Sequence, residues 1–251
     1  MSMPPQVIAH RGASADAAEN TMPAFELAWR QGADGVECDV RLTADCQVVC
    51  IHDADTERVA GKLLSVENHS YADLQALDVG SWKGEEFKES RIPLLSELLA
   101  ASPSGKQLLI EVKTGVEILP ALLEVLDAST IQLRVVTIIA FDVEVIRSLK
   151  QQRPELHAYW LIDVQSNWLG RSKLKLDDVL ETLIEIRADG VGLRCHSGIH
   201  REMVHAILSA DLALNIWTVD DATDARRFAT FGVTSITSNE PAAMLVALFE
   251  R

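Results

Sequence analysis

Residues 35–53, GVECDVRLTADCQVVCIHD, decide the fold of this chain. Two apolar runs within them, Gly35–Asp39 and Val48–Ile51, have the length and composition of short β-strands. Only a few residues around LTADCQ connect the two runs. A connection that short permits antiparallel pairing alone, because a parallel crossover needs about a dozen residues or more. The segment therefore predicts a β-hairpin whose second arm is not a barrel strand.

With Val48–Ile51 assigned to the hairpin, eight short β-type runs remain, and stretches of helical period follow or separate them. The predicted strands are Val7–Ala9, Gly35–Asp39, Gln107–Val112, Arg134–Ile139, His157–Leu161, Gly190–Leu193, Leu212–Thr218 and Ser235–Thr237. The predicted helices are Met22–Gln31, Leu94–Ala101, Glu117–Asp127, Val143–Gln152, Leu176–Arg187, Arg201–Ser209, Ala222–Phe231 and Ala242–Glu250. This alternation predicts an α/β fold, a (β/α)8 TIM barrel, with a doubly wound open sheet as the alternative.

Residues 53 to about 93 interrupt the alternation with polar, glycine-containing sequence. We interpret them as a small insertion that follows the hairpin and packs over one end of the barrel. A length of 251 residues suits one barrel of this kind. We therefore predict a single domain over residues 1–251.

Composition and net charge argue against nucleic-acid binding and membrane association. Apolar residues make up 48% of the chain and charged residues 24%, which is ordinary for a globular protein. A net charge of -14 argues against nucleic acid and against an anionic membrane surface as partners. No run approaches the roughly 18 apolar residues of a membrane span, and the first residues lack the pattern of a signal peptide. We expect a cytoplasmic protein without stable membrane association.

The cysteines indicate a reducing compartment. The chain has 4 of them, at Cys38, Cys46, Cys50 and Cys195, and no Cys-x-x-Cys pair. That number is too small for a disulfide framework at this length, and the spacing does not suit zinc or redox chemistry. We predict free thiols, with Cys38 facing the helix layer.

Three carboxylates stand near the ends of neighbouring predicted strands. The two-residue period of a strand places Glu37 and Asp39 on one face, where their charges repel unless something neutralises them. Glu111 adds a third carboxylate from the next strand. Such a set suits Mg²⁺ or Ca²⁺ better than zinc. The alternative is an ion-pair layer in which the carboxylates only balance Arg11 and Lys113.

Two histidines, His10 and His52, also stand at strand ends. Each one taken alone is more often a structural residue, but two beside a predicted metal site indicate proton transfer near neutral pH. Trp217 is either a core residue or an apolar wall for a ligand. Arg194 and His196 have weaker support, because the sequence supplies no partner for them.

Taken together, these segments resemble the cytoplasmic bacterial type of the glycerophosphodiester phosphodiesterase family. The motifs are AHRGAS, ENTMPAFELA, GADGVECDVRLTADCQVVCIHD, RIPLLSELL, LLIEVK and NIWTVDD, and the resemblance runs from Val7 to Pro241. It implies a (β/α)8 barrel with a small insertion after the hairpin. It also implies metal-dependent hydrolysis of glycerophosphodiesters to glycerol 3-phosphate and an alcohol, a reaction of glycerol and lipid metabolism.

The resemblance also implies roles for individual residues: acid/base catalysis by His10 and His52, binding of one Mg²⁺ or Ca²⁺ by Glu37, Asp39 and Glu111, and phosphate contact by Arg11 and Lys113. Related barrel phosphodiesterases suggest that the glycerol 2-hydroxyl attacks first and forms a cyclic phosphate, which water then opens. We predict His10 as the base and His52 as the acid.

Four positions depart from the family's pattern. Ala18 stands in place of Pro, Ala140 in place of Ser, Asp220 in place of the Asn after WTV, and Asn239 in place of the Asp of a late Thr-Asp-x-Pro pattern. These departures leave the preferred alcohol open. The alternatives are a lysophospholipase D-type phosphodiesterase and a non-catalytic glycerophosphate-binding barrel. The sequence does not distinguish a monomer from a homo-oligomer.

Overall fold

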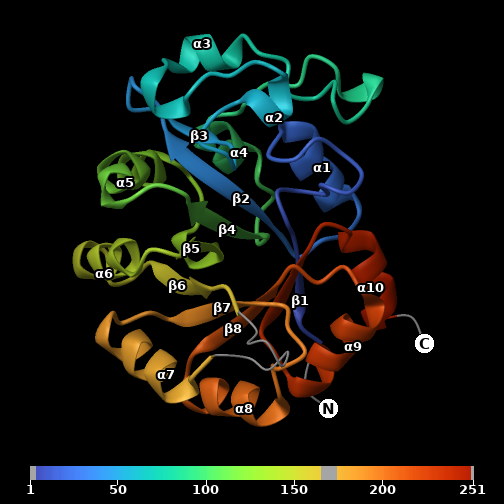
Figure 1. The fold of residues 1–251 in the computed structure, drawn as a ribbon, viewed down its shortest axis with the longest axis vertical. Coiled ribbons are helices and arrows are strands. Elements are labelled where there is room, and N and C mark those ends of the chain that lie inside the picture. Colours follow the sequence, from blue (N-terminus) through green and yellow to red (C-terminus); the bar gives the residue numbers. More distant parts are fainter. Residues whose placement is uncertain (1–3, 165–173, 250–251) are drawn as a thin grey trace.

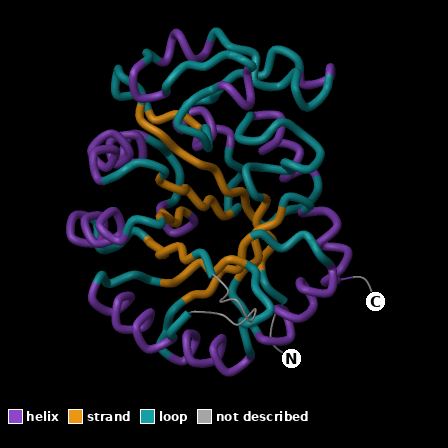
Figure 2. The backbone as a smooth tube through the Cα atoms, in the orientation of Figure 1, coloured by secondary structure: helices purple, strands orange, loops and turns teal. Residues whose placement is uncertain are grey.

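A closed ring of eight parallel strands forms the centre of the molecule, and helices surround it (Figure 1, Figure 2). The computed structural model describes residues 4–164 and 174–249. The barrel strands are β1 (Gln6–Ala9), β2 (Gly35–Leu42), β4 (Gln107–Val112), β5 (Val136–Ala140), β6 (His157–Ile162), β7 (Gly190–Arg194), β8 (Ala213–Trp217) and β9 (Ser235–Ser238). Pairing of β1 with both β9 and β2 closes the ring. The predicted TIM barrel is confirmed, and the open-sheet alternative is excluded.

The hairpin is also present. Strand β3 (Val48–Cys50) pairs antiparallel with the end of β2, from Val40 to Leu42. The prediction that β2 ends at Asp39 was too short, because the hydrogen bonds to β3 extend the strand beyond the barrel, where β2 last pairs with β4 at Val40. Asp39 therefore lies near the end of the barrel portion of β2, in a strand that continues to Leu42.

The outer layer consists of helices near the predicted positions. They are α1 (Met22–Arg30), α4 (Leu95–Ala101), α5 (Leu119–Ala128), α6 (Val143–Gln152), α7 (Leu176–Glu185), α8 (Arg201–Ser209), α9 (Ala222–Phe231) and α10 (Pro241–Phe249). Glu250, the predicted end of the last helix, lies outside the described residues. Arg134, the predicted start of a strand, lies in a 3₁₀ turn, η4 (Leu133–Val135); another such turn, η3 (Val116–Ile118), precedes α5.

The main core lies between the outer face of the barrel strands and these helices. Cys38 is fully buried in that core, as expected from its alternation with Glu37 and Asp39. All four cysteines are free. None of the helices within residues 4–164 and 174–249 is both long enough and apolar enough to cross a bilayer.

The insertion is more ordered than its polar sequence indicated. It contains α2 (Glu57–Ala60), η1 (Val66–Asn68), α3 (Tyr71–Gln75) and η2 (Glu85–Phe87), and lies beside the β2–β3 hairpin at the top of Figure 1. A separate apolar cluster supports it, made by Val49, Ile51, Val59, Val66, Leu74, Val79 and Ile92. Periodicity missed these helices because each is too short to show an amphipathic repeat.

Candidate active site

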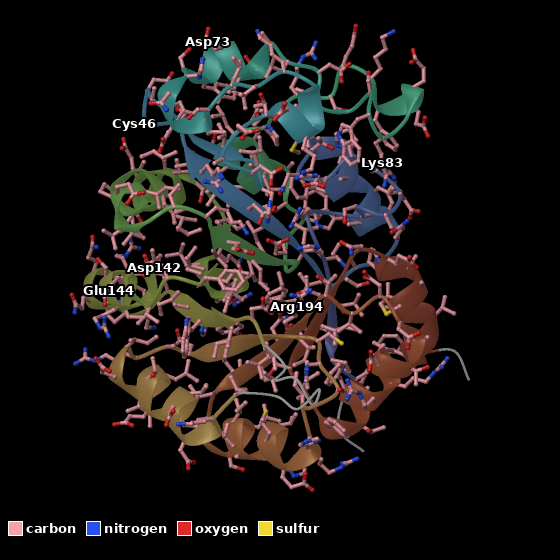
Figure 3. All side chains as sticks on the ribbon, viewed as in Figure 1. Cys46, Asp73, Lys83, Asp142, Glu144 and Arg194 are labelled. Atoms are coloured by element: carbon pink, nitrogen blue, oxygen red, sulfur yellow. The ribbon has the colours of Figure 1, made fainter. Side chains whose placement is uncertain are left out.

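Residues in the C-terminal parts of the barrel strands and just beyond them line one cavity of about 350 Å³. Of the predicted site residues, it is lined by His10, Arg11, Glu37, His52, Glu111, Lys113 and Trp217. Asp39 is fully buried and contacts two of them, Arg11 and Lys113. Arg194, labelled near the middle of the ring in Figure 3, lines the same cavity. Residues distant in sequence therefore meet at the C-terminal ends of the strands, where barrel enzymes place their chemistry.

The three carboxylates form a compact cluster. One oxygen atom of each lies within 4.8 Å of one oxygen atom of the others. The parallel register of β2 and β4 accounts for part of this, because it pairs Asp39 directly with Glu111. Exposed fractions of 2% for Glu37, 0% for Asp39 and 7% for Glu111 show that little water reaches them. Such burial of like charges is unfavourable unless a cation compensates it.

The carboxyl pKa values differ in direction across the cluster. Burial, together with the charges of Asp39 and Glu111, raises the pKa of Glu37 well above its usual value. Burial and the Asp39 charge raise the pKa of Glu111 to about 7. Burial alone would also raise the pKa of Asp39, but the charges of Arg11 and Lys113 outweigh it and leave that pKa lowered. Asp39 is thus the carboxylate that the protein's own cations hold ionised.

Ion pairs with the protein's own cations compensate the buried charge of two of the three carboxylates, Asp39 and Glu111. Arg11 Nε lies 3.1 Å from Asp39 Oδ2, and Lys113 Nζ lies 3.3 Å from Asp39 Oδ1 and 2.5 Å from Glu111 Oε1. Glu37 Oε2 accepts a 2.9 Å hydrogen bond from the backbone N–H of Arg11. Glu37 Oε1 is buried and has no hydrogen-bond partner in the described part of the chain. An ion-pair layer leaves this oxygen unexplained, whereas an oxygen-ligated divalent cation would satisfy it, so the donor set fits Mg²⁺ or Ca²⁺.

A tight turn after β1 positions the first catalytic candidates. Arg11 and Gly12 both have positive φ, 57° and 79°. A side chain at residue 12 would not fit, since a Cβ there would lie 2.5 Å from the backbone carbon of Ala24. The turn aims the backbone N–H of Arg11 at Glu37 and leaves His10 facing the cavity.

The two histidines reach the cavity by different routes. His10 directly follows β1. Its Nδ1 lies 2.7 Å from Asn239 Oδ1, and its Nε2 lies 4.0 Å from Glu37 Oε2. The antiparallel return of β3, closed by a bond from Ile51 N–H to the Asp39 carbonyl, brings His52 back beside the carboxylates. Its Nδ1 lies 2.7 Å from Asp53 Oδ1. Burial lowers the pKa of both rings.

Two supporting residues, Glu19 and Asn20, were missed as site residues. Asn20 precedes Thr21, the N-cap residue of α1. Asn20 donates to Asp39 Oδ2 at 2.7 Å and accepts from the Asp39 backbone N–H at 3.1 Å. Glu19 accepts from Arg11 Nη1 at 2.9 Å. Their place in the ENTMPAFELA motif, just before a helix, was the available signal.

Aromatic and charged residues complete the cavity. Trp217 packs edge-on against Phe141, with ring centroids 5.5 Å apart, and both line the cavity as a wall. Arg194 finds a partner that the sequence did not reveal, Asp163, at 3.2 Å. His196 is not among the lining residues, and its Nδ1 accepts from the backbone N–H of Gly198.

Comparison with known proteins identifies the family of this chain. Residues 10–243 match the glycerophosphoryl diester phosphodiesterase family. The chain belongs to this family. It is accordingly a phosphoric diester hydrolase, which confirms the resemblance noted in the motifs and sets aside the non-catalytic barrel.

Relatives within the family align over most of their length. A glycerophosphodiester phosphodiesterase of Caldanaerobacter subterraneus is 30% identical, with 95% of this chain and 96% of the relative covered. One of Bacillus subtilis is 28% identical, with 93% and 83% covered. The structure of a phosphodiesterase from Oleispira antarctica, in complex with the product sn-glycerol-3-phosphate, is 28% identical, with a TM-score of 0.83 and coverage of 97% and 96%.

Proposed function

We propose that this family member is a metal-dependent glycerophosphodiester phosphodiesterase that releases glycerol 3-phosphate and an alcohol. The observation that carries the proposal is the buried Oε1 of Glu37, which has no hydrogen-bond partner among the described residues. It lies beside two further carboxylates, at the cavity that His10 and His52 line. The names of the relatives support the substrate class. An all-oxygen donor set beside two imidazoles supports hydrolysis with proton transfer at both oxygens of the scissile diester.

Glu37, Asp39 and Glu111 would hold one Mg²⁺ or Ca²⁺. When bound, such a cation would supply neutralisation of the phosphate's negative charge and would lower the pKa of a hydroxyl group in the cavity. Arg11 and Lys113 line the cavity beside these carboxylates and offset negative charge on the phosphate oxygens. Trp217, packed against Phe141, provides an apolar wall for the substrate's carbon atoms.

Proton transfer falls to the two histidines. His10 Nε2 takes the proton of the glycerol 2-hydroxyl as its oxygen bonds to phosphorus, and His52 gives a proton to the departing alkoxide as the old P–O bond breaks. The product of this step is a five-membered cyclic phosphate. In the second step the roles reverse: His52 takes a proton from water as the water oxygen bonds to phosphorus, and His10 returns a proton to the 2-oxygen as its bond to phosphorus breaks and the ring opens to glycerol 3-phosphate.

Replacing Glu37 tests the metal site. Glu37→Gln should lose chelator-sensitive activity and bind Mg²⁺ and Ca²⁺ far more weakly by calorimetry, while the fold persists because carboxylate repulsion is relieved. Glu181→Gln, an exposed change on α7, is the matched control and should behave as wild type. Full activity and metal affinity in Glu37→Gln would place the metal elsewhere.

Product analysis tests the substrate. Purified protein is incubated with glycerophosphocholine, glycerophosphoethanolamine or lysophosphatidylcholine, with and without chelator, and glycerol 3-phosphate is assayed. We expect it from the first two substrates. Choline phosphate as the product would show that the other bond is cut, and turnover of lysophosphatidylcholine alone would favour the lysophospholipase D-type alternative.

A further inference from the structure

Two of the departures from the family's sequence pattern, Asp220 and Asn239, lie in contact with each other behind His10. Asp220 follows β8 and Asn239 follows β9, so neighbouring barrel strands bring them together. Asn239 Nδ2 donates to Asp220 Oδ2 at 2.6 Å. Asn239 Oδ1 lies 2.7 Å from His10 Nδ1. The three side chains therefore form a hydrogen-bonded chain from a loop carboxylate to a ring that lines the cavity.

The orientation of the Asn239 amide follows from its partners. The carboxylate of Asp220 can only accept hydrogen bonds, and its Oδ1 already accepts from the Ser238 hydroxyl and the Asn239 backbone N–H, each at 2.8 Å. The amide must therefore present its NH₂ group to Asp220 and its oxygen to the opposite side. There, Asn239 Oδ1 accepts from the Ser14 hydroxyl at 2.9 Å as well.

This orientation selects one tautomer of His10. An amide oxygen has no hydrogen to donate, so His10 Nδ1 must carry the proton that the contact requires. The other ring nitrogen, Nε2, then keeps its lone pair on the side of Glu37 and the cavity. A neutral imidazole in this form can accept a proton at Nε2 but has no proton at Nε2 to donate.

We propose that Asn239, oriented by Asp220, is a positioning residue that holds His10 as the Nδ1–H tautomer, with Nε2 ready to accept the substrate's hydroxyl proton. The inference rests on the proposed function, in which His10 is the base. The inference concerns the pair Asp220 and Asn239 of this chain. A carboxylate at residue 239 and an amide at residue 220 could make the same number of hydrogen bonds.

The exchange supplies the decisive variants. In Asp220→Asn, the oxygen of the new amide accepts from the Ser238 hydroxyl, so its NH₂ group faces Asn239. The Asn239 amide must then rotate so that its own oxygen faces residue 220. The NH₂ of Asn239 would meet His10 Nδ1, which favours the Nε2–H tautomer. In the double variant Asp220→Asn/Asn239→Asp, the residue 220 amide donates to the new carboxylate, and that carboxylate again accepts from His10 Nδ1–H.

We would measure the tautomer and the kinetics on metal-loaded protein. Nitrogen-15 NMR of the histidine side chains, with the His10 signals assigned by their loss in His10→Ala, should show Nδ1–H in wild type, Nε2–H in Asp220→Asn and Nδ1–H again in the double variant. Because general-base catalysis contributes about 100- to 10,000-fold, kcat should fall by a factor in that range in Asp220→Asn with KM nearly unchanged. The double variant should recover to within about tenfold of wild type.

Asp221→Asn is the matched control, because it removes a carboxylate from the same loop. The Asp221 carboxylate caps α9, whereas the Asp220 carboxylate accepts from Asn239. It should leave the His10 tautomer and kcat unchanged. A wild-type tautomer in Asp220→Asn, or lost activity that the double variant does not restore, would overturn the inference and leave the pair a structural link between loops. Wild-type protein with Nδ1–H but no hydrolysis of glycerophosphodiesters would instead contradict the proposed function.

Discussion

The two histidines of the site are held from different parts of the molecule. His10 belongs to the barrel: its Nδ1 meets the neutral amide oxygen of Asn239, and its side chain is 16% exposed. His52 belongs to the boundary with the insertion: its Nδ1 meets the carboxylate of Asp53, and its side chain is 31% exposed. Arg58 of α2 donates in turn to Asp53 Oδ2 at 2.6 Å.

This difference bears on which ring takes a proton and which gives one. A carboxylate partner and greater contact with water both favour the charged imidazolium, whereas an amide partner and deeper burial favour the neutral ring. Burial lowers the pKa of both rings, and the charge of Asp39 opposes that effect at each; the hydrogen bond that opposes it further comes from the Asp53 carboxylate at His52 and from the Asn239 amide at His10. The contrast between the two Nδ1 partners is the basis on which we keep His10 as the proposed base and His52 as the proposed acid.

The largest expected effect comes from removing each histidine and changing the leaving group. Choline leaves as a basic alkoxide that needs a proton, a contribution of about 100- to 10,000-fold, whereas p-nitrophenolate scarcely needs one. His52→Ala should lose most activity on glycerophosphocholine and keep much of it on glycerophospho-p-nitrophenol. His10→Ala should be poor on both substrates, because the base activates the attacking hydroxyl whatever leaves.

Both histidine variants must first bind metal as wild type does, since a damaged metal site would depress the two substrates together. Selective rescue of His10→Ala by p-nitrophenolate would reverse the assignment. Rescue of neither variant would indicate that the alkoxide departs without a proton from His52.

A smaller effect on activity should follow from removing the hydrogen bond by which Arg58, in the insertion, orients the Asp53 carboxylate beside His52. Arg58 donates to Asp53 and, through both terminal nitrogens at 2.8 Å, to Glu19. Arg58→Gln should reduce kcat on glycerophosphocholine by about 3- to 10-fold, the value of one or two partly exposed hydrogen bonds to charge, and change the p-nitrophenyl substrate less. Lys88→Gln, which loses an exposed ion pair to Glu85 in the insertion, is the control.

Equal losses on the two substrates would contradict this account of Arg58. They would indicate that Arg58 acts through Glu19 on Arg11, which belongs to the barrel side of the site.

The smallest effect concerns pH and the insertion's own stability. Backbone N–H groups of Glu89, Ser81 and Gly80 and the Ser81 hydroxyl all donate to Asp78, and these bonds, that from Glu89 foremost, lower its pKa. Because the folded pKa lies below the unfolded value of about 3.9, the stabilisation is complete above that pH and is lost as pH falls through the folded value.

Asp78→Asn should therefore speed hydrogen exchange of insertion amides relative to wild type at pH 6, and the difference should shrink below about pH 3.9. Barrel amides serve as the internal control and should be unaffected. Equal acceleration in the barrel would show that the insertion does not open as a separate unit.

The sequence predicted the barrel and the centre of the site because both follow local rules. The two-residue strand period placed Glu37 and Cys38 on opposite faces of the strand, and the short hairpin connection excluded Val48–Ile51 from the barrel. Both expectations are confirmed. Prediction failed where the signal is short or not periodic: the helices α2 and α3 of the insertion, and the extension of β2 to Leu42 by pairing with β3.

By itself, the sequence determined the alternation of strands and helices and the presence of carboxylates and histidines at strand ends, since these depend on residues within a few positions of each other. Only the tertiary structure decided which partners those groups have. His10 and Asn239 are 229 positions apart and meet because β1 and β9 are neighbours in the closed barrel. Likewise Arg58 reaches Glu19 across 39 positions only when the insertion packs on the first loop. Hydrogen-bond partners at such separations are chosen by the folded geometry, and no local propensity encodes them.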